Sequence, residues 1–207
     1  MKKVILASAS PRRATLLYNL GLNFTIVPAA IDESILPHEK PVDAVMRIAA
    51  AKAEAAGSKN PDAIVIAADT VVVCKGQILG KPVDDREAFM MLSTLSGDVH
   101  EVITGLCVLD STSGMRDIDF EKTLVRFREL DKEEIEAYIA SGEPQDKAGA
   151  YGIQGRAAIF VAGLEGCYYN VVGLPLSRLY MMLKRQGLCL LESGIGERIQ
   201  NRHQGPA

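Results

Sequence analysis

The sequence of 207 residues contains no tryptophan, and only 5% of its residues are aromatic. Surfaces on which single-stranded nucleic acids stack are therefore few. The chain also lacks an excess of positive charge. Its formal net charge is −3, whereas proteins that bind nucleic acids without sequence preference usually carry a basic surface. We therefore expect no stable binding to nucleic acids.

Long apolar runs are also missing, since none approaches the roughly 20 residues that a membrane-spanning helix needs. Lys2 and Lys3 are followed by four apolar residues, which is too short a run for a secretory signal. The sequence has few cysteines and no CxxC pair; they stand far apart, at Cys74, Cys107, Cys167 and Cys189. This pattern is typical of free thiols in a reducing compartment and not of a zinc site or a disulfide framework. We expect a cytoplasmic protein without a membrane segment.

Common catalytic motifs are absent as well: the sequence contains no Walker A motif, no GxGxxG, no HExxH and no GxSxG. What is present is the composition of a globular protein, with 48% hydrophobic and 24% charged residues. A chain of this length can bury a substantial core. Chemistry must therefore be sought in the arrangement of individual polar residues.

Strand-like and helix-like patterns alternate along the chain. The predicted strands are Val4–Ala7, Phe24–Val27, Ala63–Ala68, Val71–Cys74, Gln77–Leu79, Val99–Leu109, Arg116–Phe127 and Ala158–Ala162. The predicted helices are Pro11–Leu20, Pro41–Ala56, Asp84–Leu95, Asp131–Ala140 and Pro175–Arg185. This order predicts an α/β fold in which a mixed, twisted sheet is flanked by helices. Residues 189–207 are polar and without periodicity, so we expect a flexible C-terminal tail and assign it no role.

Two arginines, Arg12 and Arg13, lie in the first turn of the first predicted helix. Ser10 suits the N-cap and Pro11 the first helical position. Cations at the N-terminus of a helix are disfavoured by about 0.3–1 kcal/mol each, a cost that a bound anion would offset. With Ser8, Ser10 and free backbone N–H groups, the arginines would form a cradle for phosphate. The alternative is two solvated arginines on an ordinary helix.

Asp69 follows the buried run Ala63–Ala68. Open α/β sheets bind their ligands at the carboxyl ends of central strands. A carboxylate there can bind Mg²⁺ or take a proton from water. The alternative is a residue that begins the turn before a hairpin.

Three further charged residues are candidates. Lys52 lies in the apolar stripe of the helix Pro41–Ala56, so its ammonium must either reach the surface or meet a buried anion. Lys81 stands between Gly80 and Pro82 in what is otherwise a common surface turn. Glu33 lies in a polar loop, where solvated carboxylates are the usual case.

The segment Asp146–Gly155 has three glycines within seven residues around Tyr151. Such bare backbone can lie flat against a base or a sugar, and the Gln154 amide can read a base edge; the alternative is a flexible loop. Together, a phosphate cradle, two carboxylates and two further lysines match the hydrolysis of a polyphosphate.

Five segments resemble the motifs of the Maf family of nucleoside triphosphate pyrophosphatases. They are Leu6–Arg13, Ala67–Thr70, Leu79–Pro82, Ser96-Gly97 with His100, and Asp146–Gly155. The resemblance extends over about residues 3–186, so residues 1–188 are expected to form one Maf-like domain. It implies two lobes around a deep cleft, a fold similar to that of the inosine triphosphate pyrophosphatases, and a possible homodimer.

The resemblance implies cleavage between the α- and β-phosphates of a nucleoside triphosphate with a divalent cation, Mg²⁺ or Mn²⁺. Asp69 matches the family's proposed proton acceptor and could equally ligate the metal, with Glu33 as a second carboxylate ligand. Glu33, Lys52 and Lys81 match positions implicated in activity. Ser8 and the arginine pair fall in the phosphate-binding loop.

Within the family, an arginine, a threonine and a glutamine mark the branch that prefers dTTP and UTP, and Arg12, Thr70 and Gln154 occupy those places here. The chain thus resembles this branch and not the one that prefers 7-methyl-GTP. The Gln154 amide could pair with the imide edge of uracil or thymine, leaving cytosine poorly matched. Removal of such nucleotides, standard or modified, would prevent their incorporation into nucleic acids.

A second function remains open, because Maf proteins are associated with arrest of septum formation when overproduced. On that hypothesis the protein is a nucleotide-sensing regulator of cell division with slow or absent turnover. The dense set of acids and lysines favours the enzyme.

Overall fold

The computed structural model describes residues 2–191, and most of the predicted tail lies outside these residues. Its sheet has seven strands: β1 (Lys3–Leu6), β2 (Thr25–Ile26), β3 (Ala63–Cys74), β4 (Gln77–Leu79), β5 (Val99–Asp110), β6 (Arg116–Phe127) and β7 (Val161–Glu165). The α-helices are α1 (Pro11–Asn19), α2 (Pro41–Gly57), α3 (Asp85–Leu95), α4 (Lys132–Ile139), α5 (Tyr168–Val172) and α6 (Leu176–Arg185). Three short 3₁₀ helices are η1 (Glu143–Asp146), η2 (Ala148–Ala150) and η3 (Arg156–Phe160).

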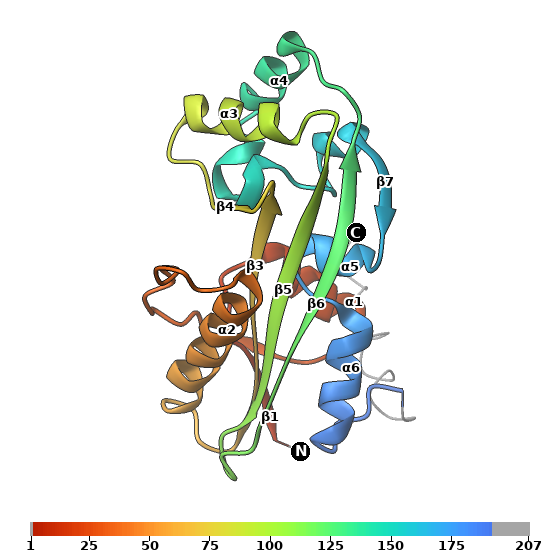
Figure 1. Cartoon of the computed structure of the whole chain (residues 1–207). Helices are drawn as coiled ribbons and strands as arrows, with labels where there is room; N and C mark the ends of the chain where they lie inside the picture. Colours follow the sequence, from red (N-terminus) through yellow and green to blue (C-terminus); the bar gives the residue numbers. More distant parts are fainter. Residues whose placement is uncertain (1, 192–207) are drawn as a thin grey trace, which may run out of the picture.

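The strands follow the order β2-β1-β3-β5-β6-β7, and β4 pairs with the far end of β3. Strand β1 is parallel to β2 and β3, and the remaining pairs are antiparallel. The predicted α/β fold with a mixed sheet is therefore confirmed. Strands β3, β5 and β6 have 12 residues each and run the length of the molecule (Figure 1).

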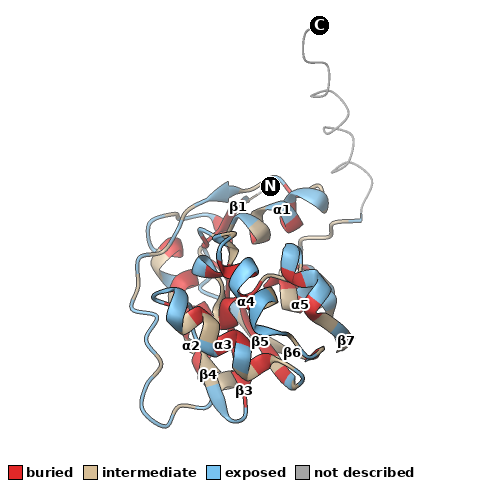
Figure 2. Cartoon of the chain, turned by 90° about the horizontal axis from the view of Figure 1, so that it is seen from above, coloured by how far each residue is buried: buried red, intermediate tan, exposed pale blue. Residues whose placement is uncertain are grey.

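Alternation along β3 decides what each face of the sheet packs against. Ile64, Ile66 and Ala68 share a buried apolar cluster with α1 and α6. Ala63, Val65 and Ala67 share another with the alanine-rich face of α2. Figure 2 shows buried residues gathered on the strands and on the helix sides that face them. Consecutive residues of β3 are thus presented to helices on opposite faces of the sheet.

The two predicted lobes are the two ends of this sheet. Helices α1, α2 and α6 cover one end, and α3 and α4 lie at the other (Figure 1). The second end has its own core, in which Val72, Val102 and Phe127 pack with Leu92 and Phe160. The long strands therefore connect the two lobes.

Two sequence predictions about strands were wrong. The runs Ala63–Ala68 and Val71–Cys74 form the single strand β3, so Asp69 neither ends a strand nor begins a turn. The run Ala158–Ala162 is mostly the 3₁₀ helix η3, and strand β7 begins only at Val161. Ala157 and Phe160 are both buried at the i, i+3 spacing of a 3₁₀ turn, which explains an apolar run that is not a strand.

The four cysteines are free thiols, as predicted, and two of them, Cys74 and Cys107, are buried. Over residues 2–191 no helix combines the length and the apolar character needed to cross a membrane.

Candidate active site

The site lies where β3 changes neighbours along one of its edges. Strand β1 pairs with β3 as far as Ile66, and β4 begins to pair only at Val72. Among the described residues, no strand therefore covers this edge of β3 at residues 67–71, although β5 pairs with the opposite edge. A pocket of ≈ 700 Å³ opens at this edge. The pocket also lies beyond the carboxyl end of β1, which is where open α/β sheets bind their ligands.

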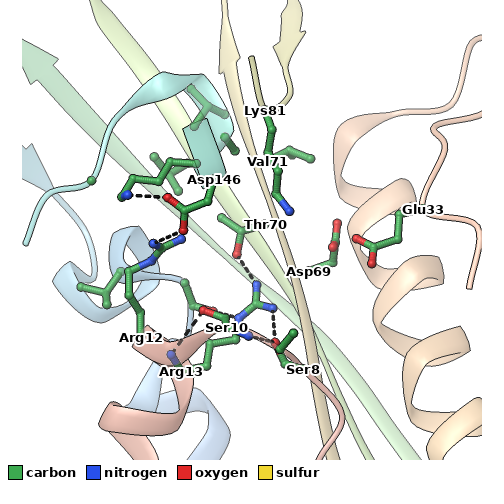
Figure 3. A pocket seen from close by; sticks show the side chains of 18 of the residues that line it. Ser8, Ser10, Arg12, Arg13, Glu33, Asp69, Thr70, Val71, Lys81 and Asp146 are labelled. Atoms are coloured by element: carbon green, nitrogen blue, oxygen red, sulfur yellow. Dashed lines mark hydrogen bonds and ion pairs between the residues drawn. The ribbon is translucent and has the colours of Figure 1, made fainter. Parts of the chain in front are cut away.

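All ten residues predicted for the site line this one pocket. They are Ser8, Ser10, Arg12, Arg13, Glu33, Lys52, Asp69, Thr70, Lys81 and Gln154. Because Asp69 and Thr70 are consecutive on β3, they meet partners from opposite faces of the sheet: α2 for Asp69 and α1 for Thr70. Figure 3 shows Asp69 turned toward Glu33, and Thr70 turned toward Arg13.

On the α1 side, Arg13 is buried and holds the structure of the site together. Its Nη1 donates to the carbonyl oxygen of Ala68 at 2.9 Å and to Ser8 Oγ at 3.1 Å. Its Nη2 donates to Thr70 Oγ1 at 2.9 Å, and its Nε donates to the carbonyl oxygen of Gly173 at 2.8 Å. Four of the five guanidinium N–H groups are thus used within the protein. The bond to Ala68 satisfies a carbonyl on the uncovered edge of β3.

The start of α1 has the predicted cap. Ser10 Oγ accepts the backbone N–H of Arg13 at 3.5 Å, and Pro11 is the first helical residue. The Ser8 hydroxyl accepts the backbone N–H of Ser10 at 3.2 Å, which fixes the turn between β1 and α1. Burial lowers the pKa of the Arg13 guanidinium, although Asp69 acts in the opposite direction.

Arg12 contacts the other lobe. Its Nη1 lies 3.1 Å from Asp146 Oδ2, at the end of η1, and Lys147 Nζ lies 2.5 Å from the other oxygen of this carboxylate. Arg12 and Asp146 both line the pocket and are in direct contact there (Figure 3). Asp146 is therefore a further charged residue of the site, at the start of the glycine-rich segment Asp146–Gly155.

On the α2 side, Lys52 lies between two carboxylates. Its Nζ is 2.8 Å from Asp69 Oδ1 and 2.7 Å from Glu33 Oε2. The side chains of Lys52 and Asp69 are only 9% and 12% exposed, whereas that of Glu33 is 50% exposed. Of the two alternatives left open by the sequence, Lys52 therefore meets a buried anion. Its charge also explains why Asp69 is tolerated in the middle of a buried strand.

Lys81 and Gln154 are exposed at the pocket. Within residues 2–191 neither side chain makes an ion pair or a hydrogen bond, and Lys81 points into the pocket (Figure 3). Both side chains are therefore available to a ligand.

Glu33 and Asp69 fit the predicted divalent cation. Each gives one oxygen to Lys52, and the second oxygen of each has no partner among residues 2–191. Mg²⁺ in nucleotide sites is usually held by one or two carboxylates together with substrate phosphates and water. In that part of the chain no cluster of three or more acidic, histidine or cysteine side chains could hold a metal by itself. The carboxylate pair is thus suited to a cation that arrives with phosphate.

The residues of β5 that lie next to Thr70 and Asp69 were not predicted from the sequence. Thr104 Oγ1 lies 2.9 Å from Thr70 Oγ1 and donates to the carbonyl oxygen of Asn170 at 3.3 Å. Gly105 is paired with Asp69 in the sheet, and a Cβ there would lie 2.4 Å from the backbone of Val45 in α2. A glycine inside a strand does signal a close backbone approach, so Gly105 could have been found; nothing in the sequence marks Thr104.

Comparison with known proteins identifies the family of this chain. The family model described as "Maf-like protein" matches residues 3–186. The "dTTP/UTP pyrophosphatase" of Syntrophomonas wolfei is 51% identical over 188 residues, which cover 91% of this chain and 100% of that protein. Proteins of the same name from Moorella thermoacetica and Pelotomaculum thermopropionicum are each 52% identical and cover 88% and 92% of this chain, and 94% and 100% of their own lengths. With a family match over nearly its whole described length and relatives at this identity, the chain belongs to the Maf family.

Proposed function

We propose that this chain hydrolyses dTTP and UTP to the nucleoside monophosphate and pyrophosphate. The observation that carries the proposal is the identity of about one half, over almost the full length, to three proteins named dTTP/UTP pyrophosphatase. The site supports it, since one pocket presents carboxylates and cations on both sides of a strand edge. Hydrolysis would take place in the cytoplasm and keep these nucleotides, or modified forms of them, out of nucleic acids. A homodimer remains a prediction from the family.

The positively and the negatively charged residues of the pocket have different roles in this proposal. Lys52, Lys81 and Arg12 are cations that can bind phosphoryl oxygens, and the turn at Ser8 can bind phosphate through backbone N–H groups. Glu33 and Asp69 would hold Mg²⁺ or Mn²⁺, which when bound neutralises charge on the phosphates. Alternatively, Asp69 would take a proton from an attacking water.

The experiment is incubation of the purified protein with UTP and Mg²⁺, with the products identified by phosphorus NMR. We expect UMP and pyrophosphate, with at least a ~100-fold loss of kcat in Asp69→Asn, as removal of a general base or a metal carboxylate produces. Asp98→Asn is the matched control, because Asp98 pairs with Lys75 on the surface away from the pocket. Formation of UDP and orthophosphate would contradict cleavage between the α- and β-phosphates. Nucleotide binding without turnover would favour the alternative function, a nucleotide-sensing regulator of cell division.

The same variant separates the two roles of Asp69. A loss of kcat at an unchanged Mg²⁺ requirement assigns the proton acceptor, whereas a raised Mg²⁺ requirement assigns the metal ligand.

Substrate choice is tested by the rates for UTP, dTTP, CTP and 7-methyl-GTP. We expect preference for the first two, because the Gln154 amide can match the acceptor and donor pattern of an imide edge. In Gln154→Ala the discrimination against CTP should fall about tenfold, the effect of losing one base contact. Preference of the unmodified protein for CTP or 7-methyl-GTP would overturn this assignment.

A further inference from the structure

Glu33 is the member of the site with the least support from regular structure. It lies in a loop, residues 27–40, that connects β2 to α2 and contains no helix or strand. Its side chain is half exposed, and among the described residues its carboxylate contacts only Lys52. Holding such a side chain in one place has an entropic cost. Something else in the molecule must therefore fix the loop.

Arg47 lies on the same helix as Lys52 and binds two residues of the loop that follow Glu33 in the sequence. Its Nε and Nη2 each lie 2.7 Å from one carboxylate oxygen of Glu39, and its Nη2 also donates to the carbonyl oxygen of Ser34 at 3.0 Å. The Glu39 side chain is only 11% exposed. A bidentate arginine–carboxylate pair fixes direction as well as distance, which a lysine cannot do.

The loop is braced internally around the same points. Glu39 Oε2 accepts the backbone N–H of Leu36 at 3.0 Å, so Glu39 links the loop to itself as well as to α2. Asp32 Oδ1 accepts the backbone N–H of Ser34 at 2.9 Å, which closes a turn around Glu33. Ile35 packs against the apolar cluster of Val45 on α2 and its neighbours. Residues 32–39 are thus held as one unit, and Arg47 attaches this unit to α2.

Helix α2 therefore carries both the cation that meets Glu33 and the cation that holds the loop of Glu33. The guanidinium of Arg47 and the N–H of Leu36 lower the pKa of Glu39 to about 2, so this pair remains ionised at neutral pH. Arg47 pairs with Glu39, and Lys52 pairs with Glu33 and Asp69.

We propose that Arg47 and Glu39 are positioning residues, whose ion pair holds the loop so that the Glu33 carboxylate stays at the pocket beside Asp69. The inference rests on the proposed function, because it assigns Glu33 to the cation and phosphate site. Neither residue lines the pocket, so both act through Glu33. Changes to residues that orient a metal-binding carboxylate typically cost 10–100-fold in metal affinity or activity.

The test compares Arg47→Met and Arg47→Lys with Arg116→Met. Arg116 is the matched control, because it pairs with the exposed Glu54 of α2 and, among the described residues, forms no ion pair with the loop. Three quantities are measured: kcat/KM for UTP as a function of Mg²⁺ concentration, hydrogen exchange of the backbone amides of residues 32–36 without nucleotide, and the midpoint of thermal unfolding.

In Arg47→Met we expect kcat/KM to fall by about 10–100-fold and the Mg²⁺ concentration for half-maximal rate to rise about tenfold, as for other residues that orient a metal-binding carboxylate. Exchange in residues 32–36 should become faster. Arg47→Lys should recover only part of each effect, because it keeps the charge without the two-point contact. Arg116→Met should match the unmodified protein.

Unchanged Mg²⁺ dependence together with unchanged exchange in Arg47→Met would overturn the proposal. So would an activity loss that only follows a lower unfolding midpoint and is fully recovered in Arg47→Lys. Failure of the proposed function would be seen differently, as an unmodified protein that does not hydrolyse UTP. In that case the exchange measurement would still decide whether Arg47 holds the loop.

Discussion

Arg13 and Lys52 approach β3 from opposite faces of the sheet and meet consecutive residues, Thr70 and Asp69. Arg13 is surrounded by neutral acceptors, two of which are backbone carbonyls, and four of its five N–H groups are used. Lys52 meets two carboxylates, each of which keeps an oxygen that no residue in the described part of the chain occupies. We infer that Arg13 mainly stabilises the folded structure of the site, because its acceptors are neutral groups of the protein. Lys52 lies between carboxylates that can still bind a ligand, so we assign it to the reaction.

The sharpest test of this difference is Arg13→Met. Removal of the guanidinium leaves the carbonyls of Ala68 and Gly173 without donors, at about 1–3 kcal/mol each. We expect the free energy of unfolding, measured by urea denaturation, to fall by about 3–5 kcal/mol, as when other buried charged networks lose a partner. Arg12→Met is the control, because Arg12 makes one part-exposed ion pair and should change stability by less than about 1 kcal/mol. Equal losses in the two variants would show that Arg13 is not structural.

Lys52→Met should have the opposite profile. We expect kcat for UTP to fall by about 10²–10³-fold, the usual cost of removing one electrostatic group from an active site. The free energy of unfolding should fall by about 1–3 kcal/mol, less than in Arg13→Met, because loss of Lys52 leaves Asp69 without its cation but both carboxylates line the pocket, where water can reach them. Lys122→Met, which removes an exposed ion pair with Glu101, is the control for loss of a lysine charge. A variant that is unstable but fully active per folded molecule would contradict the comparison.

A third buried group, His100, extends the comparison to the other lobe. It is packed against Phe127 and Tyr151, and its Nε2 lies 2.8 Å from the Tyr151 hydroxyl. Burial lowers the pKa of His100 to about 4. Whereas Arg13 and Lys52 are buried as cations with partners, His100 is buried as a neutral ring.

This gives a pH dependence of stability. The His100 side chain takes up a proton near pH 6.5 in the unfolded chain and only near pH 4 in the folded chain. The contribution of the neutral ring to the free energy of unfolding is therefore fully present above pH 6.5 and is lost as the pH falls toward 4. The loss amounts to about 3 kcal/mol at its fullest. In His100→Gln this part of the pH dependence should vanish, as measured by urea denaturation between pH 7 and 4. The same slope in both proteins would show that His100 is not the group responsible.

Local sequence signals predicted most of the elements. Ser10 and Pro11 begin α1 as expected, and Asp131, at the start of the predicted fourth helix, caps α4 in a capping box with Glu134. The turn at Lys75 and Gly76 joins β3 to β4, and both residues have positive φ, as two-residue hairpins require. Each of these features is decided by residues within one or two turns of the chain.

Features decided by distant partners could not be predicted in the same way. Asp69 in an apolar run is typical of a turn, and only Lys52, from another element, makes it acceptable within a strand. The residues that the family motifs indicated do line one pocket, but the motifs did not indicate that nearly all N–H groups of Arg13 are used within the protein. Those contacts depend on backbone carbonyls, which a sequence motif does not reveal.

The two faces of β3 can also be compared by substituting an uncharged residue, Gly105. It lies opposite Asp69 on β5, and a Cβ there would lie 2.4 Å from the Val45 backbone, so Gly105→Ala must displace α2. We expect a loss of about 1–3 kcal/mol in the free energy of unfolding, as for other overpacked sites. Because the displaced helix carries Lys52, kcat should fall by more than this loss of stability explains. Gly173→Ala is the counterpart on the α1 side: its Cβ would lie 3.6 Å from Arg13 Nε, and its φ of +114° makes alanine strained. If only α2 positions the catalytic residues, Gly173→Ala will lower the free energy of unfolding while kcat per folded molecule changes little. An equal loss of kcat in both variants would show that the α1 face of β3 positions catalytic residues as much as the α2 face does.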